Sequence, residues 1–155
     1  MPKKVLSDMV FRPIRPADYK KNLTAEELAE VLVTRLGLKR KASRANHSKL
    51  LLEMLRFKRE NIPLKIEEIA QILGVSTSQA YEEIRKWRTL GLVEFIKLQK
   101  PTGEMEKGYM LTANTANRLI DRVESSINAF LRATRRIAKD FDDVFMLEFV
   151  RKEKT

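Results

Sequence analysis

An apolar repeat near the C-terminus limits what this chain can fold into. Apolar side chains recur there at alternating spacings of four and three residues, with one threonine among them: Ala116, Ile120, Val123, Ile127, Phe130, Thr134, Ile137, Phe141 and Val144. This spacing is the a/d pattern of a coiled-coil seam, sustained over nearly four heptads. It predicts a long helix from about residue 114 to residue 140.

A helix of that length needs something to cover its apolar side. About 26 residues of α-helix extend ~39 Å, and the rest of the chain is long enough for only a small core. The helix therefore either packs along its own domain or pairs with the same helix of a second copy. We expect the second arrangement, a homodimer whose interface comprises Ala116, Ile120, Val123, Ile127, Phe130, Thr134, Ile137 and Phe141.

Four shorter helices and a hairpin are predicted before this repeat. Thr24 and Glu27 have the spacing of a capping box for the first helix, which ends at Gly37. The next helices span about 43–60, 66–73 and 76–89. Residues 94–99 partly alternate in polarity, as a strand does, and a turn-like segment with Pro101 and Gly103 follows. Residues 108–112 are expected to form the returning strand. Pro13 and Pro16 exclude a continuous helix in the arm formed by residues 1–22.

The order of these elements is that of a winged helix-turn-helix. Gly74 supplies a left-handed turn position between the third and fourth helices, and Val75 is expected to fill the space between them. A small core is predicted from Ile69, Ala70, Leu73, Ala80 and Ile84. The fold class is mainly α with a small β-hairpin wing, divided into an N-terminal arm and helix (1–42), a winged helix-turn-helix domain (43–113) and a long C-terminal dimerisation helix with its tail (114–155).

Three stretches resemble winged-helix transcription regulators of the MarR, ArsR and PadR kinds. They are Ile69-Ala70-Gln71-Ile72-Leu73-Gly74-Val75-Ser76, Gly91-Leu92-Val93 and Gly108-Tyr109-Met110-Leu111-Thr112, and the resemblance covers about residues 43–115. It implies double-stranded DNA as the partner, and it implies that residues 76–88 form the recognition helix, whose start enters the major groove.

The resemblance and the helical period together suggest which side chains meet DNA. Ala80, Ile84 and Trp87 are expected to face inward, which turns most of the other side chains outward. Gln79 is a candidate for an adenine edge. The expected DNA contacts are Ser76, Thr77, Ser78, Gln79, Tyr81, Glu82, Arg85 and Lys86 on the recognition helix, and Lys97, Lys100 and Lys107 on the wing.

The charge balance favours an anionic partner. The chain has 31 Lys and Arg against 21 Asp and Glu, a net charge of +10. The excess is most concentrated between residues 39 and 44, where we expect phosphate contacts from Lys39, Arg40, Lys41 and Arg44. The alternative interpretation is an ordinary solvated surface.

Two adjacent acidic residues count against a DNA-reading helix. Glu82 and Glu83 lie within it, and a carboxylate repels phosphates more often than it pairs with a cytosine. Despite these two residues, the main hypothesis is a dimeric transcriptional regulator that binds DNA with full or partial sequence specificity. The alternatives are a protein-binding winged-helix module of a transcription or replication assembly and a non-specific chromatin-associated protein.

Other function classes find little support in the sequence. The absence of cysteine excludes disulfides and thiolate zinc sites. We expect His47, the single histidine, on a helix surface or facing a phosphate. The acidic residues between Asp140 and Glu148 indicate a helix end rather than a magnesium site. With no phosphate loop or nucleophile elbow, we expect no enzyme, no metal and no cofactor, and a soluble cytoplasmic, nucleoid-associated protein without membrane contact.

Overall fold

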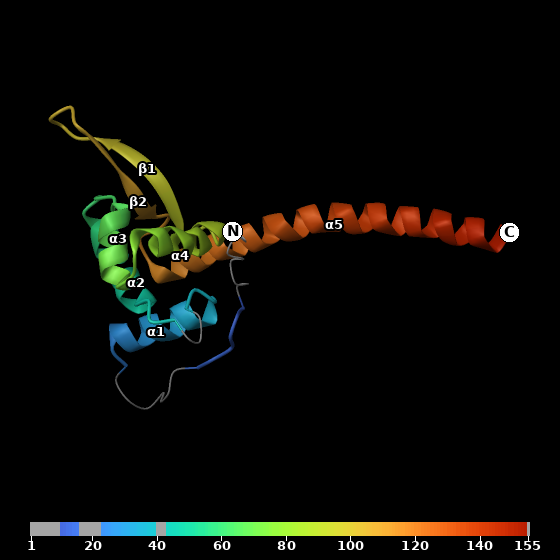
Figure 1. The fold of residues 1–155 in the computed structure, drawn as a ribbon, viewed down its shortest axis with the longest axis horizontal. Coiled ribbons are helices and arrows are strands. Elements are labelled where there is room, and N and C mark those ends of the chain that lie inside the picture. Colours follow the sequence, from blue (N-terminus) through green and yellow to red (C-terminus); the bar gives the residue numbers. More distant parts are fainter. Residues whose placement is uncertain (1–9, 16–22, 40–42, 155) are drawn as a thin grey trace.

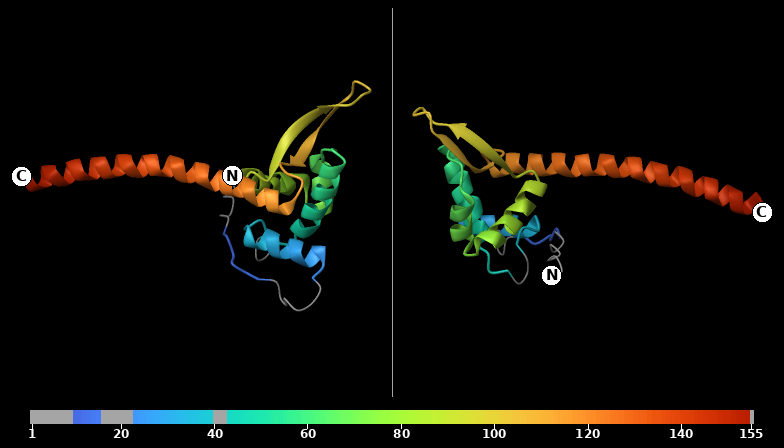
Figure 2. Two further views of the ribbon diagram at one scale, coloured as in Figure 1. Left: turned by 180° about the vertical axis from the view of Figure 1, so that it is seen from behind. Right: turned by 45° about the horizontal axis from the view of Figure 1, so that its top comes forward.

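The computed structural model describes residues 10–15, 23–39 and 43–154. The shorter helices form a compact body, from which a β-hairpin projects in one direction and a long helix in another (Figure 1). Two further views show the same arrangement, with the C-terminus at the far end of the long helix (Figure 2). In chain order the elements are α1 (Ala25–Arg35), α2 (His47–Arg59), α3 (Ile66–Leu73), α4 (Thr77–Thr89), β1 (Val93–Gln99), β2 (Met105–Leu111) and α5 (Ala116–Lys154).

Local capping interactions determine where α1 begins and ends. The Thr24 side chain accepts a hydrogen bond from the backbone of Glu27 at 3.1 Å. At the other end Gly37 has a φ of +74°, and the backbone N–H of Leu38 donates to the carbonyl of Val33. That bond and the left-handed glycine make a Schellman ending, which satisfies carbonyls that the helix leaves free. Both boundaries agree with the sequence-based expectation.

The helix-turn-helix forms from α3 and α4 as predicted. Helix α3 has the expected bounds and ends at Gly74, whose φ of +74° is left-handed. Ser76 then caps α4 by accepting a hydrogen bond from the backbone of Gln79 at 3.2 Å. Helix α2, however, begins at His47 rather than near Ser43, because Asn46 caps it by accepting from the backbone of Lys49.

The core lies where α2, α3 and α4 meet the base of the hairpin and the start of α5. Trp87 is its largest fully buried side chain. Ala80 and Ile84 are buried beside it, so the predicted inward face of α4 is confirmed. Other members of the core include Leu50, Met54, Leu64, Ile69, Leu73, Leu111, Leu119 and Val123.

The hairpin is longer than the sequence pattern predicted. Strand β2 begins at Met105 and pairs antiparallel with β1 in a register from Val93–Leu111 to Gln99–Met105. Leu64 adds a short bridge by exchanging backbone hydrogen bonds with Tyr109 at 2.7 and 2.9 Å. A Cβ atom on Gly108 would come within 2.5 Å of the Leu64 carbonyl oxygen. Glycine at this position therefore lets the base of the wing lie against the body.

Helix α5 extends well past the predicted end near Asp140 and continues to Lys154. Only its start belongs to the body: Leu119 and Val123 are buried, and Ile127 packs against the core. Ile120 of the expected dimer seam is 39% exposed, whereas Val123 and Ile127 of the same seam pack into the core of their own chain. From residue 128 to residue 153 every residue is exposed.

Candidate nucleic-acid interface

The start of α4 presents a row of polar side chains to solvent. Thr77, Ser78 and Gln79 are exposed, and Tyr81 is 49% exposed in the next turn. The opposite side of the same turns is held by the burial of Ala80 and Ile84. These polar groups therefore have a fixed orientation and no role in the core, as a base-reading surface requires.

Further along α4, the structure divides the expected contacts into two groups. Arg85 is exposed, as predicted, and Glu82 is partly exposed. Lys86 is buried, which contradicts its predicted outward position. Its ammonium nitrogen lies 3.3 Å from Oε2 of Glu83, the residue that precedes it by three positions on the same helix. Lys86 is therefore a structural residue and is removed from the candidate interface.

Glu83 is the centre of a buried polar chain that links α4 to α2. Its Oε2 accepts a hydrogen bond from Nε2 of His47 at 2.9 Å, and the indole Nε1–H of Trp87 donates to Nδ1 of His47 at 3.1 Å. Because an indole nitrogen can only donate, Nδ1 must accept and Nε2 carries the proton. His47 is 1% exposed, so the expectation that it faces solvent or a phosphate was wrong.

This buried polar chain of side chains keeps the Glu83 carboxylate charged inside the protein. Burial raises its pKa, but the hydrogen bond from His47 and the nearby ammonium of Lys86 outweigh that effect and leave the pKa below its ordinary value. The charges of Glu83 and Lys86 balance each other. One of the two acidic residues that counted against DNA binding is thus turned away from the exposed face of α4.

The wing presents two of its three lysines freely. Lys97 and Lys107 are exposed and lie opposite each other in the strand register. Lys100 instead pairs with Glu106 at 2.6 Å, and that hydrogen bond raises the pKa of the lysine. Lys97 and Lys107 therefore remain the stronger candidates for phosphate contacts.

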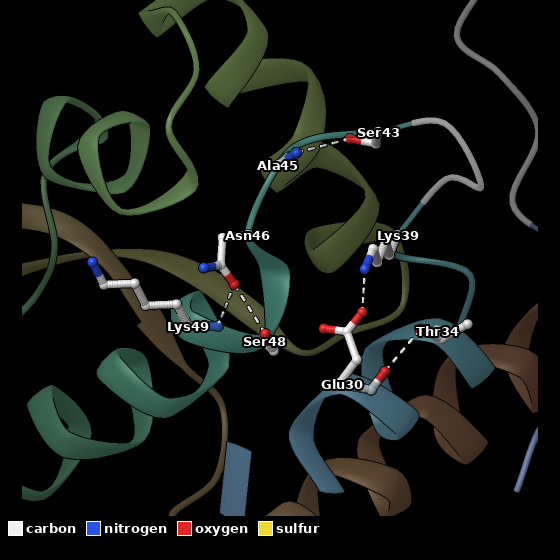
Figure 3. A network of polar contacts seen from close by, with 8 residues as sticks. All are labelled: Glu30, Thr34, Lys39, Ser43, Ala45, Asn46, Ser48 and Lys49. Atoms are coloured by element: carbon white, nitrogen blue, oxygen red, sulfur yellow. Dashed lines mark hydrogen bonds and ion pairs between the residues drawn. The ribbon is translucent and has the colours of Figure 1, made fainter. Parts of the chain in front are cut away.

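The predicted basic cluster between α1 and α2 is only partly described. Arg40 and Lys41 lie outside the described residues. Arg44 is exposed. Lys39 points toward Glu30 of α1 and forms an ion pair with it (Figure 3), and this hydrogen bond lowers the pKa of Glu30. Lys39 thus joins the segment between α1 and α2 to the middle of α1, rather than extending alone into solvent.

One exposed basic side chain on α4, that of Arg88, was not among the DNA contacts predicted from the sequence. The guanidinium carbon of Arg88 lies 6.0 Å from the centre of the Tyr109 ring on β2, within the range of a cation–π interaction. It connects the end of α4 to the wing. No local sequence signal could identify it, because its aromatic partner lies on another element and becomes adjacent only in the fold.

The described residues contain neither a metal-binding cluster nor a membrane-spanning helix. In the ranges that the structure describes, no group of three or more histidine, aspartate or glutamate side chains could hold a metal ion. Over the same residues, no helix combines the length and the apolar character needed to cross a membrane.

Comparisons with known proteins give the chain no family. No family model matches it, and no curated protein matches it in sequence. Among solved structures it is distantly similar to a possible transcriptional regulator from Methanosarcina mazei Go1. The identity is 12%, the match covers 59% of this chain and 77% of that chain, and the TM-score is 0.31. The description of this chain therefore rests on its own geometry, which is a winged helix-turn-helix followed by a long C-terminal helix.

Proposed function

We propose that this protein binds double-stranded DNA as a homodimer and acts as a transcriptional regulator. The observation that carries the proposal is the polar row at the start of α4. Thr77, Ser78, Gln79 and Tyr81 are all exposed on the second helix of a helix-turn-helix. In this motif the start of the second helix reads base edges in the major groove.

The surrounding charges support a DNA partner. Arg85, Arg88, Lys97 and Lys107 are exposed bases on α4 and the wing. Phosphate contacts supply the part of DNA affinity that does not depend on sequence. Since Glu83 is buried with Lys86, Glu82 is the one acidic side chain of α4 that reaches its surface.

The homodimer part of the proposal depends on α5. Beyond the body the helix leaves large apolar side chains in solvent, among them Phe130 and Ile137 at 68% and Phe141 at 63% exposure. Contiguous exposed apolar surface of this kind marks an interaction site in soluble proteins. A second copy of the same helix is the partner that the apolar repeat favours.

Binding to duplex DNA over a series of salt concentrations tests this function. We expect retention on a duplex that weakens steeply with salt, and a shallower salt slope for the double variant Lys97→Ala/Lys107→Ala, by up to ~0.9 per lost phosphate contact. Lys100→Ala is the matched control, because its ammonium already pairs with Glu106. If the wild-type protein shows no salt-sensitive retention on duplex DNA, the protein-binding module becomes the better account.

A further inference from the structure

The exposed half of α5, residues 128–153, has no covering element in the described part of the chain. Its large apolar side chains lie on more than one face: Phe130, Leu131, Ile137, Phe141, Val144, Phe145, Met146, Leu147, Phe149 and Val150. Phe145 stacks between Phe141 and Phe149, with ring centroids 5.9 and 6.3 Å apart. A surface this apolar and this long requires a partner of matching length.

Charged residues divide the same segment into two blocks of opposite sign. Residues 132–139 include four basic side chains and no acidic one: Arg132, Arg135, Arg136 and Lys139. Residues 140–148 include four acidic side chains and no basic one: Asp140, Asp142, Asp143 and Glu148. In the described structure none of these eight side chains forms an ion pair within α5. Both blocks are therefore available to a second chain.

The order of the two blocks discriminates between the possible pairings of two α5 helices. In a parallel, in-register pair the basic block of one helix lies beside the basic block of the other, and the two acidic blocks likewise lie side by side. Packed helices lie 8–10 Å apart, which is comparable to the Debye length of about 8 Å at physiological salt, so such repulsion is only partly screened. In an antiparallel pair centred between the blocks, each basic block faces an acidic one.

We infer that the exposed half of α5 pairs antiparallel with the same segment of a second copy, about a two-fold axis near Lys139. This inference rests on the homodimer of the proposed function and specifies its geometry. In this register Thr134 lies opposite Val144 of the second copy and Ile137 lies opposite its Phe141. Residue 128 meets residue 150, so each exposed segment covers the other along almost its whole length. The contact is isologous and closes at two chains.

Cysteine cross-linking tests the direction of the helices, because the natural chain has no cysteine. We choose Thr134→Cys and Val144→Cys, in separate full-length chains that differ in mass by a tag. Both positions are exposed, so neither substitution disturbs the body. We expect a disulfide-linked pair only when the two variants are mixed, unfolded and refolded together, and then oxidised, and we expect that pair to contain one chain of each kind.

Two other outcomes would overturn the inference. Parallel pairing would cross-link each variant to itself, since each cysteine would then face its own copy. A monomeric mass for the untagged wild-type chain, with no cross-link in any sample, would remove the pairing altogether. Duplex binding, measured on the same preparations, keeps the two proposals apart: a parallel pair that binds DNA contradicts only the antiparallel geometry.

Discussion

At the scale of single residues, the side chains that point inward on α4 explain how its outer face is held. Trp87 fills the core with its ring and also donates a hydrogen bond to His47. His47 in turn donates a hydrogen bond to the Glu83 carboxylate, and the Lys86 ammonium neutralises the negative charge of that carboxylate. This polar chain ties α4 to the first turn of α2. It therefore fixes how far α4 can rotate, and with it the direction in which Gln79 and Tyr81 point.

Replacing Glu83 with glutamine tests the importance of this chain for stability. The change leaves the Lys86 ammonium buried without a countercharge. Breaking a buried pair costs about 3–5 kcal/mol, and we expect about 3 because the amide oxygen still accepts from His47. Urea unfolding measures the loss. Glu82→Gln, one position earlier and partly exposed, is the control and should change stability by less than about 0.5 kcal/mol. Equal losses of stability in the two variants would show that the buried polar chain does not stabilise the fold.

Acid should weaken the same interaction in a defined direction. The pKa of Glu83 is lower in the folded protein than its ordinary value, which is about 4.3 for an unfolded chain. Its contribution is therefore complete above about pH 4.3 and is lost as the pH falls through the folded pKa. We expect the stability gap between wild type and Glu83→Gln to shrink on acidification from about pH 7 to about pH 3. A gap that is constant over this range would mean that Glu83 does not titrate with unfolding.

Some of these residue positions could be predicted from the sequence. The inward positions of Ala80, Ile84 and Trp87 follow from spacing alone. Spacing could not place Lys86 and His47 correctly, because polar residues carry no periodic signal that distinguishes a buried ion pair from a solvated flank. Their burial depends on where the start of α2 meets α4, and that contact joins residues 36 and 40 positions apart in the chain.

At the scale of elements, helix boundaries were predicted correctly where the sequence has a strong terminating residue, and incorrectly where it has none. Helix α3 was predicted to the residue because Gly74 ends it. The end of α5 was missed because the acidic residues from Asp140 onward were interpreted as a terminus. Charged residues do not end a helix, and the chain contains no glycine or proline after Gly108. That absence was the signal for a longer helix.

The exposed seam of α5 can be tested without disturbing the body. Ile137 is 68% exposed in the single chain, so aspartate at this position costs little within one copy. In a dimer seam the same carboxylate would be buried without a partner, which is strongly unfavourable. We expect Ile137→Asp to elute as a monomer in size exclusion with light scattering while its body keeps the wild-type thermal stability.

Ser125→Asp provides the matched control for this experiment. It adds the same charge to an exposed position of α5 that lies outside both the apolar repeat and residues 128–153, and it should leave the mass unchanged. If Ile137→Asp retains the mass of the wild-type dimer, the seam lies elsewhere on the molecule.

At the scale of the whole molecule, the structure separates two tasks. A long helix, α5, extends from a compact winged-helix body (Figure 1). The body displays the polar start of α4, and the extended part of α5 carries the exposed apolar side chains and the two charged blocks. In the antiparallel pair that we infer, the two bodies lie at opposite ends of a shared rod. The order of the helices and strands was predictable from the sequence. The length of α5 that extends beyond the body was not predictable, because it depends on where the helix leaves the body. The structure places that point after Ile127.

If the start of α4 reads DNA, the double variant Gln79→Ala/Tyr81→Ala should differ from the wild type in how it discriminates between DNA sequences. Both side chains are exposed, so the melting temperature should stay near that of wild type. Affinities of both proteins are measured for a duplex selected by the wild type and for a scrambled duplex at one salt concentration. We predict that the variant loses the preference, at about 1–3 kcal/mol per lost base contact, and keeps its affinity for the scrambled duplex. A variant that retains the full preference, or a wild type that has none, would contradict the claim.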